Sequence, residues 1–169
     1  MQGIDIVLEL AKKLIVHDDV RILLVGRGSE VPRLKAEAES RGLYNLLIYD
    51  EIASAEVPAL LSQCSIGLLL LDPRLKTQNV PGKLISYMQA GLPILARINV
   101  GNDLFDIISD NEVGLVNAGE DNEKFFAMAD FLLNNNLALA EMSAKSRLKA
   151  SELFSTIVAC KQISMALEL

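Results

Sequence analysis

The stretch that decides the fold is "NVPGKLISYMQAGLPIL", residues 79–95. A proline and a glycine come first, a lysine follows, and apolar residues then recur with helical spacing up to a Gly-Leu-Pro break and a short apolar run. The pattern predicts a helix over 81–91 that leads into a strand over 92–97. Because lysine is favoured near the negative C-terminus of a helix, Lys83 at the N-terminus suggests that an anion binds beside it.

The same alternation of helix and strand extends in both directions from this stretch. The predicted strands are 20–26, 45–50, 65–72, 92–97 and 112–118. The predicted helices are 3–16, 29–42, 54–64, 81–91, 102–111, 121–135 and 137–154, with a further helix in the tail, 155–169. This order predicts a single α/β domain over 1–169, with a doubly wound, Rossmann-like parallel sheet of about five strands.

The amino-acid composition supports the α/β class and argues against nucleic acid and anionic membranes as partners. Of the 169 residues, 51% are hydrophobic and only 5% are aromatic, which suits buried parallel strands. The net charge of −6 opposes binding to nucleic acid or to an anionic membrane. The longest apolar run, 66–71, is far too short to span a membrane, and a single histidine cannot build a His-based metal site.

Ligands of such sheets bind outside the carboxyl ends of the strands. The segments that land there are 26–30, 49–54, 72–83 and 97–103. The third is unusually long for a strand-to-helix connection, carries Arg74, Lys76 and Lys83, and leads into a helix N-terminus that can hold a phosphate. It predicts a phosphate-bearing ligand, and the alternative is a surface loop with solvated lysines.

Several stretches resemble one enzyme family. The segment "PGKLISYMQAGLPILA" resembles the P-S-K-L-x-E-Y-M-A-x-G-x-P-V-I-A segment of retaining GT-B glycosyltransferases of family four. The segment "QGIDIVLELAKKL" is similar to the K-G-I-D helix of the same domain. Residues 20–71, 112–135 and 150–155 follow further segments of the family, so the resemblance covers nearly the whole chain.

The resemblance implies a C-terminal, donor-binding half that lacks its own first strand. That strand would lie between the strands at 21–25 and 66–71, and the acceptor-binding half would precede Met1. The chain would then be a fragment, inactive alone, that can self-associate through the sheet edge left open. The intact enzyme would transfer a sugar from a nucleoside diphosphate to an acceptor hydroxyl, without a fixed metal or other cofactor. Its product would be a bacterial surface polysaccharide or lipopolysaccharide, made in the cytoplasm or at the inner face of the membrane.

The resemblance also assigns residues to the donor. They are Gly26, Gly28, Glu51, Ile52, Gln78, Val80, Gly82, Lys83, Leu84 and Ser86. The backbone N–H groups of Gly82, Lys83 and Leu84 would face the diphosphate, with Val80 in the same segment. The strand end at 51–52 would meet the base.

Two of these residues are glycines at a turn, and two others depart from the family pattern. Gly26 and Gly28 would let the chain approach the nucleotide, or would simply make the turn. Gln78 and Ser86 stand where the family's E-x7-E motif has glutamates that contact the sugar and the ribose. Because neither is a carboxylate, a bond from either to a hydroxyl is weaker.

Two other interpretations stay open. A GT-B-fold sugar-nucleotide epimerase would bind the same nucleotide but would need acid–base carboxylates around the sugar. A flavodoxin-like interaction domain would share the fold, and a signalling receiver would need an acidic cluster of which only Asp50 and Glu51 are present.

Overall fold

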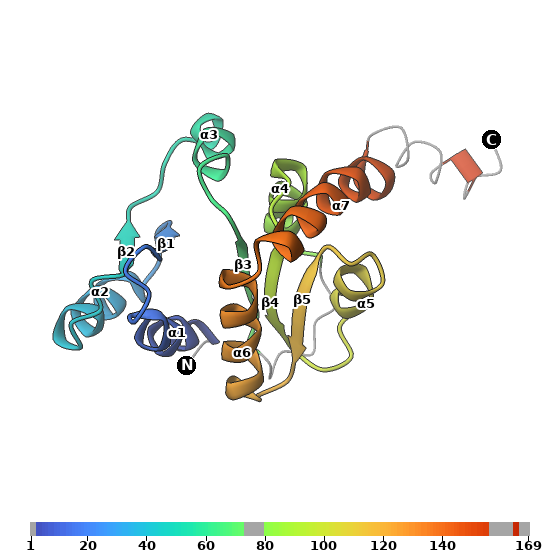
Figure 1. Cartoon of the computed structure of the whole chain (residues 1–169). Coiled ribbons are helices and arrows are strands. Elements are labelled where there is room, and N and C mark those ends of the chain that lie inside the picture. The colour runs from blue at the N-terminus through green and yellow to red at the C-terminus, as the bar shows by residue number, and fades with distance from the viewer. Residues whose placement is uncertain (1–2, 73–79, 156–163, 166–169) are drawn as a thin grey trace.

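Helices and strands alternate throughout the computed structural model, which describes residues 3–72, 80–155 and 164–165 (Figure 1). The strands are β1 (Ile22–Val25), β2 (Leu46–Tyr49), β3 (Gly67–Leu70), β4 (Ile94–Ile98) and β5 (Gly114–Ala118). The helices are η1 (Gly3–Asp5), α1 (Ile6–Leu14), α2 (Val31–Ser40), η2 (Ser54–Glu56), α3 (Val57–Leu61), α4 (Gly82–Ala90), α5 (Leu104–Ser109), α6 (Asn122–Leu133) and α7 (Asn136–Phe154). The predicted α/β class is confirmed.

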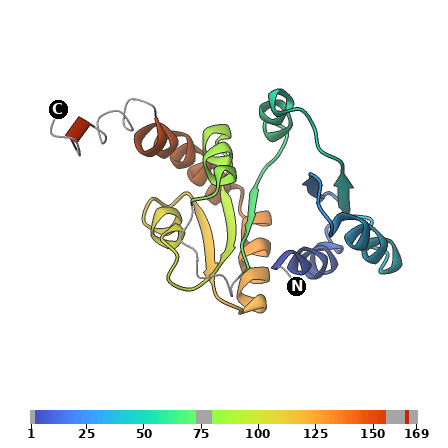
Figure 2. The same cartoon turned by 180° about the vertical axis from the view of Figure 1, so that it is seen from behind.

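The five strands form two parallel sheets rather than one. β1 pairs with β2, and β4 lies between β3 and β5. Figures 1 and 2 show the two sheets standing apart, and no pairing joins β1 to β3 in the described residues. This break falls where the resemblance implies a missing strand. The two described strands that flank it, β1 and β3, do not pair with each other.

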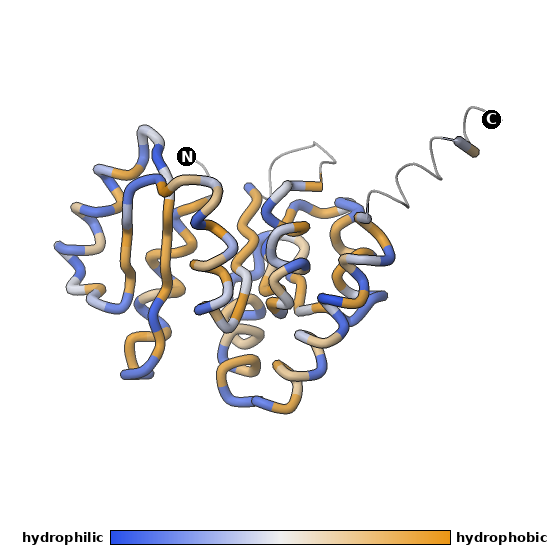
Figure 3. Tube along the Cα trace, turned by 90° about the horizontal axis from the view of Figure 1, so that it is seen from above, coloured by the Kyte–Doolittle hydropathy of each residue, from blue (hydrophilic) through white to orange (hydrophobic). Residues whose placement is uncertain are grey.

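Helices cover both faces of the larger sheet. On β4, Leu95 packs into a cluster with α1 and α6, whereas Ile94 and Ile98 pack into a second cluster with α4 and α5. All of β4 is buried. Figure 3 shows the strands as hydrophobic segments among helices whose outer turns are hydrophilic. The doubly wound arrangement is therefore confirmed.

The strands on either side of the break are less well covered than β4. Leu23, Leu24 and Val25 of β1 are only half-buried, and so are Leu68 and Leu70 of β3. Each of these strands has a hydrogen-bonded neighbour on one side alone among the described residues. Apolar side chains and unpaired backbone groups therefore flank the break on both sides.

The stretch quoted above makes a tight turn from α4 into β4. Gly91 ends α4 with a left-handed backbone (φ 74°), which glycine adopts without strain. The N–H of Leu92 donates to the carbonyl of Tyr87 at 2.9 Å, so β4 begins at Ile94, two residues later than predicted.

Tyr87 fixes α4 on β3. Its ring packs on Gly67, where an added Cβ would lie 2.6 Å from the ring, and its hydroxyl donates to the carbonyl of Leu68 at 3.3 Å. Burial raises the pKa of Tyr87. The helix N-terminus at Gly82 is thereby held in a fixed place at the carboxyl end of β3.

The described residues contain neither a membrane-spanning helix nor a cluster of metal ligands. No helix there is long and apolar enough to cross a membrane, and no three His, Cys, Asp or Glu side chains gather in a way that could hold a metal ion. The helix predicted for the tail lies mostly outside the described residues.

Candidate functional site

The N-terminus of α4 has unused hydrogen-bond donors among the described residues. Pro81 approaches it with extended backbone (ψ 139°), no described side chain caps it, and its first turn carries no acidic residue. By contrast, α6 is capped by Asp121, whose carboxylate accepts from the N–H of Lys124 at 2.9 Å. The N–H groups of Gly82 and Lys83 have no partner among the described residues, so they are available to an anion.

Lys83 adds a full positive charge at this N-terminus. Its side chain is exposed and forms no hydrogen bond or ion pair with the part of the chain that the structure describes. Leu84 has a different role from the predicted one, because its N–H donates to the carbonyl of Pro81 at 2.9 Å. Its side chain is fully buried, so Leu84 anchors the turn, and Gly82 and Lys83 are the free donors.

The surroundings of Gly82 leave room for a ligand. A Cβ added there would meet nothing within 4 Å, and Val80 just before it is exposed. Ser86 is half-buried one turn later, and its hydroxyl donates to the carbonyl of Gly82 at 3.2 Å. Its oxygen can still accept a bond from a ligand hydroxyl. Gln78, like Arg74 and Lys76, lies outside the described residues.

The other predicted donor residues lie at the ends of β1 and β2. Gly26 has φ 152°, and nothing lies within 4 Å of a Cβ added at Gly26 or Gly28, so the backbone is approachable. The Nε of Arg27 lies 2.9 Å from a carboxylate oxygen of Glu51, a contact that the sequence did not predict. Because both side chains are mostly exposed, water screens this pair. Ile52 is half-buried beside it.

These two groups of residues belong to different sheets. The group around Gly26 and Glu51 follows β1 and β2, whereas the group around Lys83 follows β3. No hydrogen bond or ion pair between the two groups is present in 3–72 and 80–155. A ligand that contacts both would have to reach across the break between the sheets.

A buried polar cluster at the ends of β4 and β5 was not predicted. The cluster contains Arg97, near the end of β4, and Asn99 and Asn102, which follow β4. It also contains Asn117, near the end of β5. The amide of Asn102 donates to Asn99 Oδ1 at 2.9 Å, and that of Asn117 donates to the carbonyl of Asp121 at 2.8 Å. The only sequence signal was a run of polar residues directly after an apolar strand.

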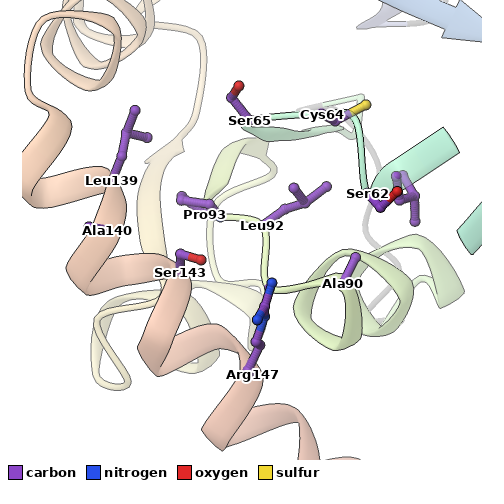
Figure 4. Close-up of a pocket in the computed structure, with 12 residues that line it drawn as sticks. Ser62, Cys64, Ser65, Ala90, Leu92, Pro93, Leu139, Ala140, Ser143 and Arg147 are labelled. Carbon is purple, nitrogen blue, oxygen red and sulfur yellow. The ribbon is translucent and has the colours of Figure 1, made fainter. Parts of the chain in front are cut away.

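A hollow of about 320 Å³ lies at the opposite, amino end of β3 and β4 (Figure 4). Arg147 of α7 points there toward the turn at Gly91, where an added Cβ would lie 2.1 Å from its Nε. A cation in this position complements the negative C-terminus of α4. Burial raises the pKa of the Cys64 thiol in the same wall, which keeps it protonated. The hollow thus lies between α7 and the C-terminal end of α4, at the opposite end of the sheet from the residues predicted to bind the donor.

Comparison with known proteins identifies the family. A family profile described as "Glycosyl transferases group 1" matches residues 1–135. No curated protein matches. Among solved structures, S. aureus TarM in complex with fondaparinux, alpha-GlcNAc-glycerol and UDP is 20% identical with a TM-score of 0.77, and the match covers 94% of this chain and 31% of TarM.

Two further structures share the fold. WaaG, a glycosyltransferase involved in lipopolysaccharide biosynthesis, is 20% identical with a TM-score of 0.73 over 96% of this chain and 43% of WaaG. The C-terminal domain of LpcC from Francisella tularensis is 13% identical with a TM-score of 0.70 over 91% of this chain and 80% of that one. The chain thus spans less than half the length of TarM and WaaG.

The family match and the fold agree with each other. The profile matches far more than half of the 169 residues, and the structural matches cover nearly all of the described fold. The chain therefore belongs to the group 1 glycosyltransferases, and it has the fold of the C-terminal domain of a GT-B enzyme of this family.

Proposed function

We propose that the chain binds the nucleoside diphosphate of a sugar donor at the N-terminus of α4. The observation that carries this proposal is the combination of a helix end, two backbone N–H groups and the ammonium of Lys83, none of which has a partner in 3–72 and 80–155. These groups converge where Gly82 leaves the backbone accessible. In a protein with net charge −6, such a local concentration of positive charge is suited to a diphosphate.

The chemistry would be sugar transfer in the intact enzyme. The bond between the anomeric carbon and the donor phosphate breaks, the acceptor oxygen bonds to that carbon, and the acceptor hydroxyl loses its proton. Negative charge then grows on the departing diphosphate. Lys83 and the N–H groups of Gly82 and Lys83 would stabilise this charge, and we propose that they do so without a fixed metal.

The intact enzyme would contain an acceptor-binding half that precedes this domain. This part of the proposal is supported by the length of TarM and WaaG, of which the chain matches 31% and 43%. Because WaaG acts in lipopolysaccharide biosynthesis, we propose a surface polysaccharide or lipopolysaccharide as the product. The donor would be used in the cytoplasm, at the inner face of the membrane, and the domain alone would not turn over.

Lys83→Ala is expected to weaken binding of UDP. Loss of a charge-assisted hydrogen bond should cost about 1–2 kcal/mol of binding free energy, which calorimetry at low salt in the presence of a chelator would measure. Lys12→Ala is the matched control, because Lys12 is also exposed but lies on α1. Equal affinities for UDP in the two variants would contradict a role for Lys83.

Ser86→Glu is expected to tighten binding of UDP by about tenfold, because a carboxylate accepts a stronger bond from a ribose hydroxyl. Residue 86 lies in the middle of α4, one turn after the free N–H groups, and is half-buried. Gln89→Glu adds the same charge one turn later on an exposed position and serves as the control. Unchanged or weaker affinity of Ser86→Glu would show that the ribose does not bind beside α4.

A further inference from the structure

Arg97 is a buried cation without an anionic partner among the residues that the structure describes. Only 7% of this residue is exposed. Its Nη2 donates to Asn122 Oδ1 at 3.1 Å, and its Nε is buried with no hydrogen-bond partner in the described residues. A buried charge is unfavourable unless it is paired and hydrogen-bonded, so this guanidinium lacks part of the partners that its burial requires.

The described part of the chain offers no counter-ion for Arg97. No Asp or Glu in the described residues forms an ion pair with Arg97, although Arg27, Arg33 and Arg41 each have a carboxylate partner. Two acidic residues flank Asn122. The carboxylate of Asp121 caps α6, and that of Glu123 lies 3.3 Å from Lys13 Nζ. Outside the described residues, Glu168 is the only acidic side chain in the sequence. An anion from outside this chain would complete the site.

The position of Arg97 points to the kind of anion. It lies across from Leu70 on β3 and Asn117 on β5, at the carboxyl end of the sheet. Its side chain reaches Asn122, the first residue of α6, whose N-terminus is capped by the carboxylate of Asp121 (Figure 1). Ligands of parallel sheets bind at this end of the strands. Asn122 is exposed, so the site lies just beneath the surface. The carbonyl of Arg97 accepts from Leu71, which leads toward the N-terminus of α4.

We propose that Arg97 binds a phosphate group at the carboxyl end of β4, on the side of the sheet covered by α6. Lys83 and Arg97 would then approach the ligand from opposite sides of the same edge. The inference rests on the proposed donor function for the source of the phosphate. The guanidinium is suited to this task because it can give two parallel hydrogen bonds to one phosphate.

The test is a titration of the isotopically labelled chain with inorganic pyrophosphate, UDP and citrate, each in the presence of a chelator. The NMR signal of the Arg97 Nε–H is expected to shift with pyrophosphate and UDP. Arg97→Gln is expected to weaken pyrophosphate binding by about ten- to a hundredfold, and Arg97→Lys by less, since it keeps the charge. Arg21→Gln is the control, because Arg21 is exposed and donates only to the carbonyls of Asp18 and Val20.

A second readout separates a ligand-binding role from a structural one. Removal of an unpaired buried charge should leave the melting temperature of ligand-free Arg97→Gln no lower than that of Arg21→Gln. A lower melting temperature together with unchanged pyrophosphate affinity would show that Arg97 only braces α6, and the inference would be wrong. If Arg97→Gln does not fold, the wild-type Nε–H titration decides alone.

The outcomes also distinguish this inference from the proposed function. Shifts at Gly82 and Lys83 without a shift at Arg97 would refute the inference and leave the donor function standing. A shift at Arg97 alone would support the inference and refute the role of α4. A response of Arg97 to citrate but to neither phosphate compound would mean that its partner is a carboxylate, which would overturn the inference.

Discussion

Extending the chain at its amino end by one apolar strand is expected to raise its melting temperature by roughly 6–12 °C. The strand would cover half-buried side chains such as Leu24 on β1 and Leu68 on β3. A net gain of about 3 kcal/mol is reasonable for burial of several such groups after the cost of ordering the added residues. For a domain of this size, that gain corresponds to the stated rise in melting temperature.

The place of this strand follows from how α1 is connected. Helix α1 packs in the core and leads into β1, as the second half of a strand–helix–strand unit would. Such units are right-handed and place their two strands in the same sheet. A strand ahead of α1 therefore belongs beside β1, on the side where β1 has no neighbour, and there it can also pair with β3. The two sheets would become one.

Without that strand, we expect the chain to self-associate through the open edges at micromolar concentration. Light scattering and thermal unfolding of both forms test this expectation, with an extension of equal length but polar sequence as the control. The apolar extension should abolish the association. A monomer without any extension would contradict self-association, and an apolar extension with no effect on melting would mean that the strand belongs elsewhere.

Gly114→Ala is expected to destabilise the fold by about 3 kcal/mol or more. A Cβ at residue 114 would lie 2.0 Å from the backbone oxygen of Ile94 on the neighbouring strand. Backbone atoms in the middle of the β3–β4–β5 sheet cannot move aside as a flexible side chain can. Thermal or urea unfolding would measure the loss, which could prevent folding altogether.

Gly82→Ala is the matched control for this substitution. Nothing lies within 4 Å of an added Cβ there, and alanine is favoured over glycine in a helix. Its melting temperature should therefore equal or exceed that of the wild type. If Gly114→Ala were as stable as Gly82→Ala, the close approach of β4 and β5 in the structure would be wrong.

The order of helices and strands was readable from the sequence because it depends on local patterns. The helix ending at Gly91 and the strand after it were both predicted from the "AGLP" break. The exact start of β4 was missed by two residues, because Leu92 bonds back to Tyr87 and closes the helix. The division into two sheets depends on which strands pair, and pairing is a long-range property that no local pattern encodes.

The candidate site was predicted only in part, for a related reason. Lys83 stood out because a lysine beside Pro-Gly at a helix start is locally unusual, and the structure leaves it exposed, with no partner in the part of the chain that it describes. Leu84 was assigned a free N–H that the first turn of α4 actually uses. The sequence placed Arg97 at the end of a strand and at the ligand-binding edge, but its burial was not predicted, because it follows from packing against α6.

Binding of UDP by this chain at the N-terminus of α4 is the central claim, and an NMR titration with a chelator present tests it most directly. We predict that the amide signals of Gly82 and Lys83 shift together and saturate at millimolar UDP, with smaller shifts at Glu51 and Ile52. No response at millimolar UDP, or shifts confined to residues away from Gly82 and Lys83, would contradict the claim.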